Sequence, residues 1–171
     1  NARVARINVC APTAMPPGDV QAIHAQGVDF WPLALARELD DAILHLRTNE
    51  AEIGTWVLTT SGDADLVDAA DAALLNNAED WLVREITLYL KRVFKRIDVT
   101  SRSIISLVEP GSCFTGTLLE LLLAADRSFM LDGVFEGDER PAPQIRLGAM
   151  NFGPLPMCND LTRLETRFLD D

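Results

Sequence analysis

Cysteine is scarce in this sequence, and its three occurrences, Cys10, Cys113 and Cys158, lie far apart. An odd number of widely spaced cysteines does not make a disulfide framework, and this spacing does not match a zinc site. We therefore expect a protein with reduced thiols, located in the cytoplasm, and without a bound metal.

Long hydrophobic runs and basic residues are also lacking. No apolar run reaches the ~20 residues that span a bilayer, and no signal peptide is visible, so we expect no membrane partner. The 15 basic side chains are outnumbered by 26 acidic ones, giving a net charge of -11. Such a charge repels the phosphates of nucleic acid, although a local basic pocket could still bind a phosphorylated small molecule.

The 171 residues, 48% of them hydrophobic, suit a single globular domain covering positions 1–171. The sequence has no internal repeat and no low-complexity stretch. It begins at Asn1 rather than at a methionine, so we expect it to be a fragment of a longer chain.

Hydrophobic periodicity predicts strands that alternate with helices. Period-two or β-rich runs favour strands, spacings of three and four favour helices, and the segments rich in proline and glycine favour loops. The expected strands are 3–9, 55–60, 103–109, 126–131 and 144–148, the helices are 31–49, 66–75, 81–96, 116–125 and 159–169, and the loops include 11–18 and 133–143. Asp80 is expected to cap the third helix, and His24 to lie in a loop. This alternation predicts an α/β fold with a mostly parallel sheet and packed helices.

Two turns could carry chemistry, because each follows a buried strand and opens a helix. They are the segments 62–65 (G-D-A-D) and 114–117 (F-T-G-T). Unpaired backbone N–H groups at a helix N-terminus can hold a carbonyl oxygen or an oxyanion. If the two strands are neighbours, both turns lie at one end of the sheet and could form an oxyanion hole. The alternative is that both are ordinary strand-to-helix turns.

Glu120 interrupts the otherwise apolar helix 116–125. If it is buried, its pKa rises toward a range useful for acid–base catalysis. Otherwise it faces solvent or pairs with Arg127.

Three other features have structural explanations beside functional ones. Cys113 could be a thiolate stabilised at a helix start or a small packed side chain. The acidic residues of loop 136–139 favour a solvated face over a metal site. The basic residues of 91–96 either complete a helix or meet phosphates, and we favour the first interpretation.

Two motifs resemble the crotonase (enoyl-CoA hydratase/isomerase) superfamily. Residues 106–126, S-L-V-E-P-G-S-C-F-T-G-T-L-L-E-L-L-L-A-A-D, resemble its strand, glycine-rich turn and E-L-x-x-x-x-D helix, and residues 57–66, V-L-T-T-S-G-D-A-D-L, resemble its G-A-D-L turn. The resemblance covers nearly the whole chain. It is strongest to the second half of a member that carries two crotonase-like halves in one chain.

The resemblance implies a crotonase-like fold of repeated ββα-type units and a set of site residues. Ala64 matches the first oxyanion-hole N–H, Thr117 or the adjacent Gly116 matches the second, and Glu120 matches the first catalytic glutamate. Gln144 stands where the family usually has its second glutamate, and it cannot transfer a proton as a carboxyl group does.

The implied activity of the whole enzyme is a lyase reaction that opens the oxygenated ring of a benzoyl-CoA-derived thioester. No cofactor is implied, since CoA arrives as part of the substrate; the implied partners are an acyl-CoA thioester, the missing half of the chain and further copies in a homo-oligomer. Because the motif departs from the family pattern, we expect this half to be degenerate, structural and inactive by itself.

Two alternatives remain open at this stage. The chain could be a stand-alone enoyl-CoA hydratase or isomerase with Glu120 as acid–base, which a second carboxylate near the turns would support. It could also be a non-enzymatic oligomerisation scaffold, which a filled pocket between Ala64 and Thr117 would support.

Overall fold

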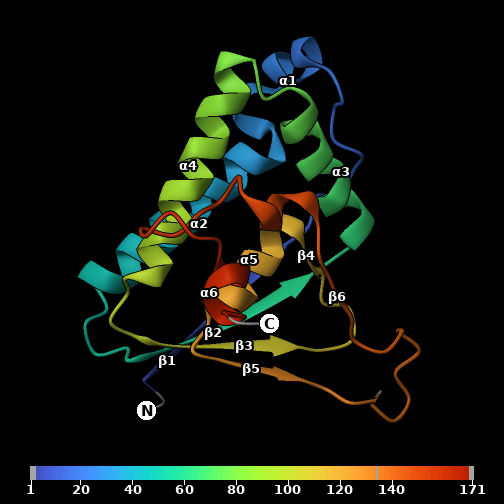
Figure 1. Cartoon of the computed structure of the whole chain (residues 1–171). Helices are drawn as coiled ribbons and strands as arrows, with labels where there is room; N and C mark the ends of the chain where they lie inside the picture. The colour runs from blue at the N-terminus through green and yellow to red at the C-terminus, as the bar shows by residue number, and fades with distance from the viewer. Residues whose placement is uncertain (1–2, 134, 170–171) are drawn as a thin grey trace.

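The protein is an α/β fold built on a four-stranded parallel sheet. The computed structural model describes residues 3–133 and 135–169. The strands are β1 (Val4–Cys10), β2 (Thr55–Ser61), β3 (Ser103–Val108) and β5 (Arg127–Met130), in the spatial order β1-β2-β3-β5. The predicted fold class, a mostly parallel sheet with packed helices, is therefore confirmed (Figure 1).

Helices follow the strands and cover one face of the sheet (Figure 1). The two longest are α2 (Trp31–Thr48) and α4 (Trp81–Asp98), which pack against each other. The remaining helices are α1 (Val20–Gln26), α3 (Ala64–Asn76), α5 (Gly116–Ala124) and α6 (Arg163–Arg167), with short 3-10 turns η1 (Gly27–Asp29) and η2 (Ala149–Phe152).

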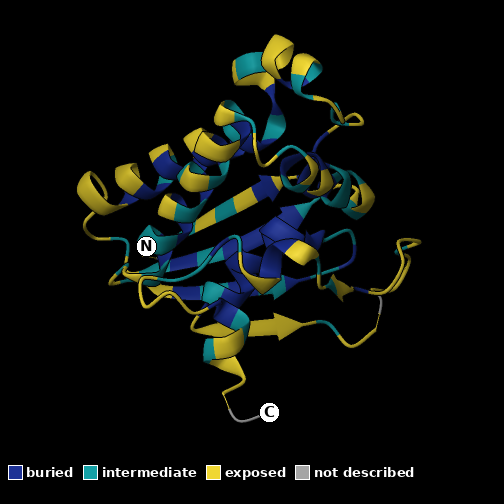
Figure 2. Ribbon diagram, turned by 45° about the horizontal axis from the view of Figure 1, so that its top comes forward, coloured by how far each residue is buried: buried dark blue, intermediate teal, exposed yellow. Residues whose placement is uncertain are grey.

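The core lies between the sheet and these helices (Figure 2). On the sheet it is formed by alternate residues such as Trp56, Leu58 and Ile104, which are almost fully buried. The outermost strand β5 is exposed at all of its residues. Among the residues that the structure describes, no helix is both long enough and apolar enough to cross a membrane.

Side-chain caps explain where two of the helices, α3 and α4, begin. Asp80 caps α4 as predicted, because its carboxylate accepts from the N–H groups of Leu82 and Val83. Asp63 accepts from the N–H of Asp65, which starts α3 at Ala64, two residues before the predicted start.

The last helix is shorter than the predicted 159–169. Thr162 and Glu165 form a capping box that starts α6 at Arg163, and the preceding residues form a turn in which the Met157 N–H donates to Leu161. The predicted strand 126–131 loses Asp126 for a similar reason, since this side chain accepts from the backbone N–H of Ile104.

One helix was not predicted, and the prediction that His24 lies in a loop is wrong. His24 is part of α1, which Asp19 caps and Gly27 ends with a positive φ of 53°. Its Nε2 atom lies 2.9 Å from Oδ1 of Asp80, so this contact fixes the short helix against the start of α4.

Candidate functional site

The two turns expected to carry chemistry meet at the carboxyl end of the sheet. Because β2 and β3 are parallel neighbours, the turns that follow them lie side by side. The N–H of Gly62 donates to the carbonyl of Gly111 at 3.3 Å, and a Cβ on Gly62 would lie only 2.7 Å from the Cβ of Ala11. Glycine at position 62 therefore lets this turn pass close to Ala11, which follows β1.

A cavity of about 310 Å³ opens beside these turns. Its lining comes from both turns and from the loop that leads to β6 (Ile145–Arg146); it comprises Gly62, Asp63, Ala64, Asp65, Gly111, Ser112, Cys113, Phe114, Arg140, Pro141, Ala142, Pro143, Gln144 and Arg146. Ala64, which matches the first oxyanion-hole donor of the crotonase family, thus lines this cavity. Gln144 also lines the cavity and offers an amide instead of a carboxyl group.

The predicted second donor, Thr117, is already engaged within the protein. Its backbone N–H donates to Oδ2 of Asp71 at 2.8 Å, and its hydroxyl donates to Oδ1 of the same carboxyl group at 2.5 Å. Neither Thr117 nor Gly116 is among the residues that line the cavity with Ala64. The structure therefore does not bring the two predicted donors into one open pocket.

Gly116 makes room for this internal carboxyl group. Its φ of 44° lies in the left-handed region, and a Cβ at this position would come within 1.9 Å of Oδ2 of Asp71. Asp71 projects from α3, which packs against α5, and only 6% of the residue is exposed. Burial is the main reason why its pKa rises from 3.8 to about 7; the hydrogen bonds from Thr117 oppose this rise.

Glu120 is buried and fully engaged. Its Oε1 accepts from the amide of Asn151 at 2.5 Å, and its Oε2 accepts from Arg163 at 2.7 Å. Only 1% of the residue is exposed, and it does not line the cavity beside the turns. Burial raises its pKa, while Asn151 and Arg163 lower it. The alternatives in which Glu120 faces solvent or pairs with Arg127 are therefore wrong.

Arg163 links this carboxylate to a second one. Its guanidinium binds both oxygens of Asp98, at 3.0 and 2.7 Å, and it also donates to the carbonyl of Leu155. Asn151 in turn donates to the carbonyl of Gly116 and accepts from the N–H of Gly148. The network joins α4, α5, η2 and α6, so its evident effect is to hold these elements together.

The remaining candidates have structural explanations. Cys113 is 1% exposed, and burial raises the pKa of its thiol, so the packed-cysteine interpretation is confirmed. In the acidic loop, Asp138 pairs with Arg140, which lowers the pKa of Asp138 to about 2. No cluster of His, Cys, Asp or Glu suited to a metal occurs within 3–133 and 135–169. In the basic segment 91–96, Arg96 pairs with Asp40 of α2.

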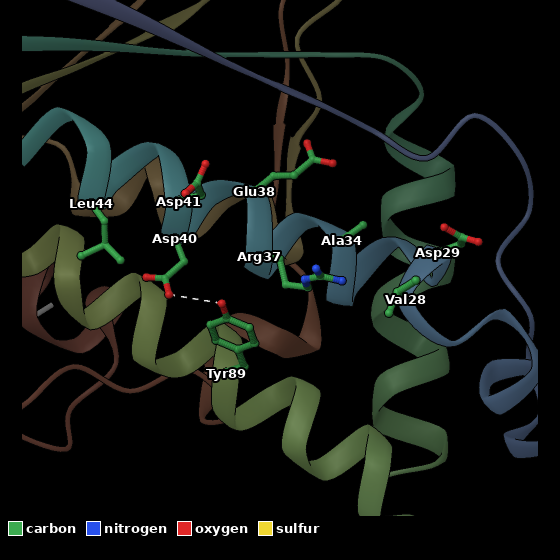
Figure 3. Close-up of a pocket in the computed structure, with 9 residues that line it drawn as sticks. All are labelled: Val28, Asp29, Ala34, Arg37, Glu38, Asp40, Asp41, Leu44 and Tyr89. Carbon is green, nitrogen blue, oxygen red and sulfur yellow. Dashed lines mark hydrogen bonds between the residues drawn. The ribbon is translucent and has the colours of Figure 1, made fainter. Parts of the chain in front are cut away.

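A wider hollow, about 610 Å³, lies elsewhere, along η1 and α2, with Tyr89 of α4 in its lining (Figure 3). It is open and acidic: Asp29, Glu38 and Asp41 line it, with Arg37 as its basic residue, and Asp40 accepts from the hydroxyl of Tyr89. Carboxylates at this density repel the phosphates of a CoA group. The charge of this hollow therefore does not favour an anionic ligand.

Sequence patterns did not single out three residues that are central to this region, Asp71, Asn151 and Arg163. A signal existed for Asp71, because it lies on the buried stripe of α3 with Val67, Ala70 and Leu74. A carboxylate on an apolar stripe is expensive to bury without partners, which is a reason to search for its donors.

The fold and the paired turns define an α/β protein of the kind that the crotonase resemblance predicts. No protein-family model matches the chain. It is 49% identical over 169 residues to the benzoyl-CoA-dihydrodiol lyase of Aromatoleum evansii, and this similarity covers 99% of the chain. The chain spans 30% of the length of that relative, so it corresponds to one part of it. The resemblance of this chain to part of a benzoyl-CoA-dihydrodiol lyase is therefore confirmed.

Proposed function

We propose that this chain is a structural part of a benzoyl-CoA-dihydrodiol lyase. In the whole enzyme, a dihydrodihydroxybenzoyl-CoA ring formed in aerobic benzoate degradation would be opened by addition of water and cleavage of carbon–carbon bonds, with release of formic acid. The identity of 49% to a protein of that name supports the assignment to the lyase. The substrate would supply CoA, and the proposal includes no further cofactor.

The observation that carries the structural role is the contact between Asp71 and Thr117. An oxyanion hole stabilises a developing negative charge only if its N–H donors are free to point at it. In this chain the N–H of Thr117 points at an internal carboxyl group 2.8 Å away. A thioester oxygen would have to displace that group, and the carboxylate form of Asp71 would repel it.

Glu120 supports the same proposal. A general acid or base must reach the proton that it transfers. Both carboxyl oxygens of Glu120 are hydrogen-bonded inside the protein, and Arg163 balances its charge. Asp71 is a second carboxyl group near the turns, but it is hydrogen-bonded to Thr117 and does not line the cavity beside Ala64. The catalytic machinery would then lie in the part of the lyase outside this chain.

The direct test is calorimetric titration of the folded chain with benzoyl-CoA and with free CoA. We expect no saturable binding signal from either benzoyl-CoA or free CoA. Circular dichroism on the same sample establishes that the protein is folded. Saturable binding of benzoyl-CoA but not of CoA would contradict the proposal, because it would require an open thioester site.

A second test uses the full-length lyase with Glu120→Gln. We expect turnover per folded enzyme to stay within about twofold of the wild type, measured well below the unfolding temperature. A loss of the 10²–10⁴-fold typical of a removed acid–base group would place Glu120 in the active site.

A further inference from the structure

An apolar groove of about 400 Å³ lies between the β6–η2 segment and α6. We call this hollow the α6 groove. It is lined by Leu147, Phe152, Thr162, Leu164, Glu165 and Phe168. Three of them are large apolar side chains that are mostly exposed: Leu147 at 59%, Phe152 at 66% and Phe168 at 52%. Exposed apolar side chains that gather in one hollow mark a surface that another molecule or segment covers.

The lining of the α6 groove is mostly apolar and therefore favours an apolar ligand or segment. Among the described residues that line it, Glu165 alone is charged, and the Glu165 carboxylate already accepts from the N–H and the hydroxyl of Thr162. The groove therefore offers hydrocarbon surface and almost no free polar group. Hydrophobic burial is the main contribution that such a surface can make to binding.

Buried hydrogen bonds hold the two walls of the α6 groove, η2 and α6, in place. Asn151 in η2 is hydrogen-bonded to Gly116 and Glu120, and Arg163 in α6 is bonded to Glu120 and Asp98. Both walls are thus fixed to α5 by buried polar contacts. A groove that is formed in advance loses little conformational entropy when it is filled.

The comparison with the lyase indicates the occupant. This chain aligns over 99% of its length but spans only 30% of that relative, so most of the relative lies outside the aligned part. A tethered segment of the same chain binds at a high effective concentration. A second copy of this chain is a poorer candidate, because it would have to reach the groove from solution without that advantage.

We propose that the α6 groove receives apolar side chains from another segment of the same lyase chain. This inference rests on the proposed function, and it adds the surface through which this part joins the rest of the enzyme. Phe152 and Phe168 are its principal contacts, since they are the aromatic residues of the groove and are more than half exposed.

The test is photo-crosslinking in the full-length lyase, with Phe152 replaced by p-benzoylphenylalanine. We expect an intramolecular crosslink that keeps the mass of one chain on a denaturing gel, and mass spectrometry should map it to a peptide outside the part that this chain represents. The matched control places the same analogue at Trp81, another aromatic residue that is 61% exposed but belongs to α4. We expect no such crosslink there.

Two outcomes would overturn the inference: a crosslinked product with the mass of two chains, or no crosslink at position 152. Either outcome leaves the lyase assignment intact, because turnover of ring substrate is measured separately on the same protein. Conversely, absence of lyase turnover in the unmodified full-length protein would contradict the proposed function whatever the crosslink shows.

Discussion

Replacing Asp71 by asparagine should change how the stability of this protein depends on pH. Burial raises the pKa of Asp71 from 3.8 to about 7 in the folded state. Below pH 3.8 the group is protonated in both the folded and the unfolded state. Between 3.8 and about 7 it is protonated only when folded, so folding takes up a proton and each rise in pH reduces stability. Above about 7 this loss is complete.

The size of the effect follows from the width of that window. One pKa unit corresponds to roughly 1.4 kcal/mol, and the window covers about three units, so the wild type should lose about 4 kcal/mol from this group. Asparagine keeps a carbonyl oxygen that can accept from the Thr117 N–H, but it does not ionise. The stability of Asp71→Asn relative to the wild type should therefore rise by about 4 kcal/mol between pH 4 and pH 8.

Urea denaturation followed by circular dichroism at half-unit steps of pH measures this difference. Taking the difference between the two proteins removes most of the contribution from other titrating groups. Asp41→Asn, at an exposed position of α2, is the matched control for replacing a carboxyl group that is not buried. A flat difference for Asp71→Asn would refute the assignment of Asp71 as a buried carboxyl group with a raised pKa.

Three further predictions concern the same region. Arg163→Met should destabilise the protein by about 3–5 kcal/mol in urea denaturation, because it leaves Asp98 and Glu120 buried without their partner; a change below 1 kcal/mol would contradict the buried network. Gly116→Ala should lower the free energy of unfolding by about 1–2 kcal/mol from its left-handed backbone alone. The further clash between the new Cβ and Asp71 should be smaller in an Asp71→Ala background. Strictly additive effects of the two substitutions would argue against that contact. A maleimide should label two thiols per native chain, Cys10 and Cys158, and a third only in urea; rapid native labelling of Cys113 would show that its thiol is accessible.

Local signals in the sequence were sufficient for most elements of the fold. The stripe that begins at Leu82 and the cap at Asp80 predicted α4, and the β-rich run from Thr55 predicted β2. The short helix α1 was missed because seven residues give too little periodicity and because the preceding prolines indicated a loop. The pairing of β4 (Phe114–Thr115) with β6 is non-local and leaves no local pattern.

The candidate site was predicted by position but not by its contacts. In the structure Ala64 begins α3, Thr117 and Glu120 lie in α5, and the parallel sheet brings the two turns together. The resemblance did not indicate that Asp71 would accept from Thr117 or that Arg163 would pair with Glu120, since these partners are 46 and 43 positions apart. Contacts at such separations depend on how the helices pack, which periodicity does not determine.

The position of Arg163 has a consequence for the order in which this protein can assemble on the ribosome. Glu120 is synthesised 43 residues before the arginine that pairs with it. At about 5–20 residues per second, α5 waits roughly 2–9 s for that partner. Arg167, which donates to the carbonyls of Leu123 and Ala125 at the end of α5, arrives later still. Helix α5 therefore completes its polar contacts only after Arg163 and Arg167 have been synthesised, and until then its buried carboxylate lacks its basic partner.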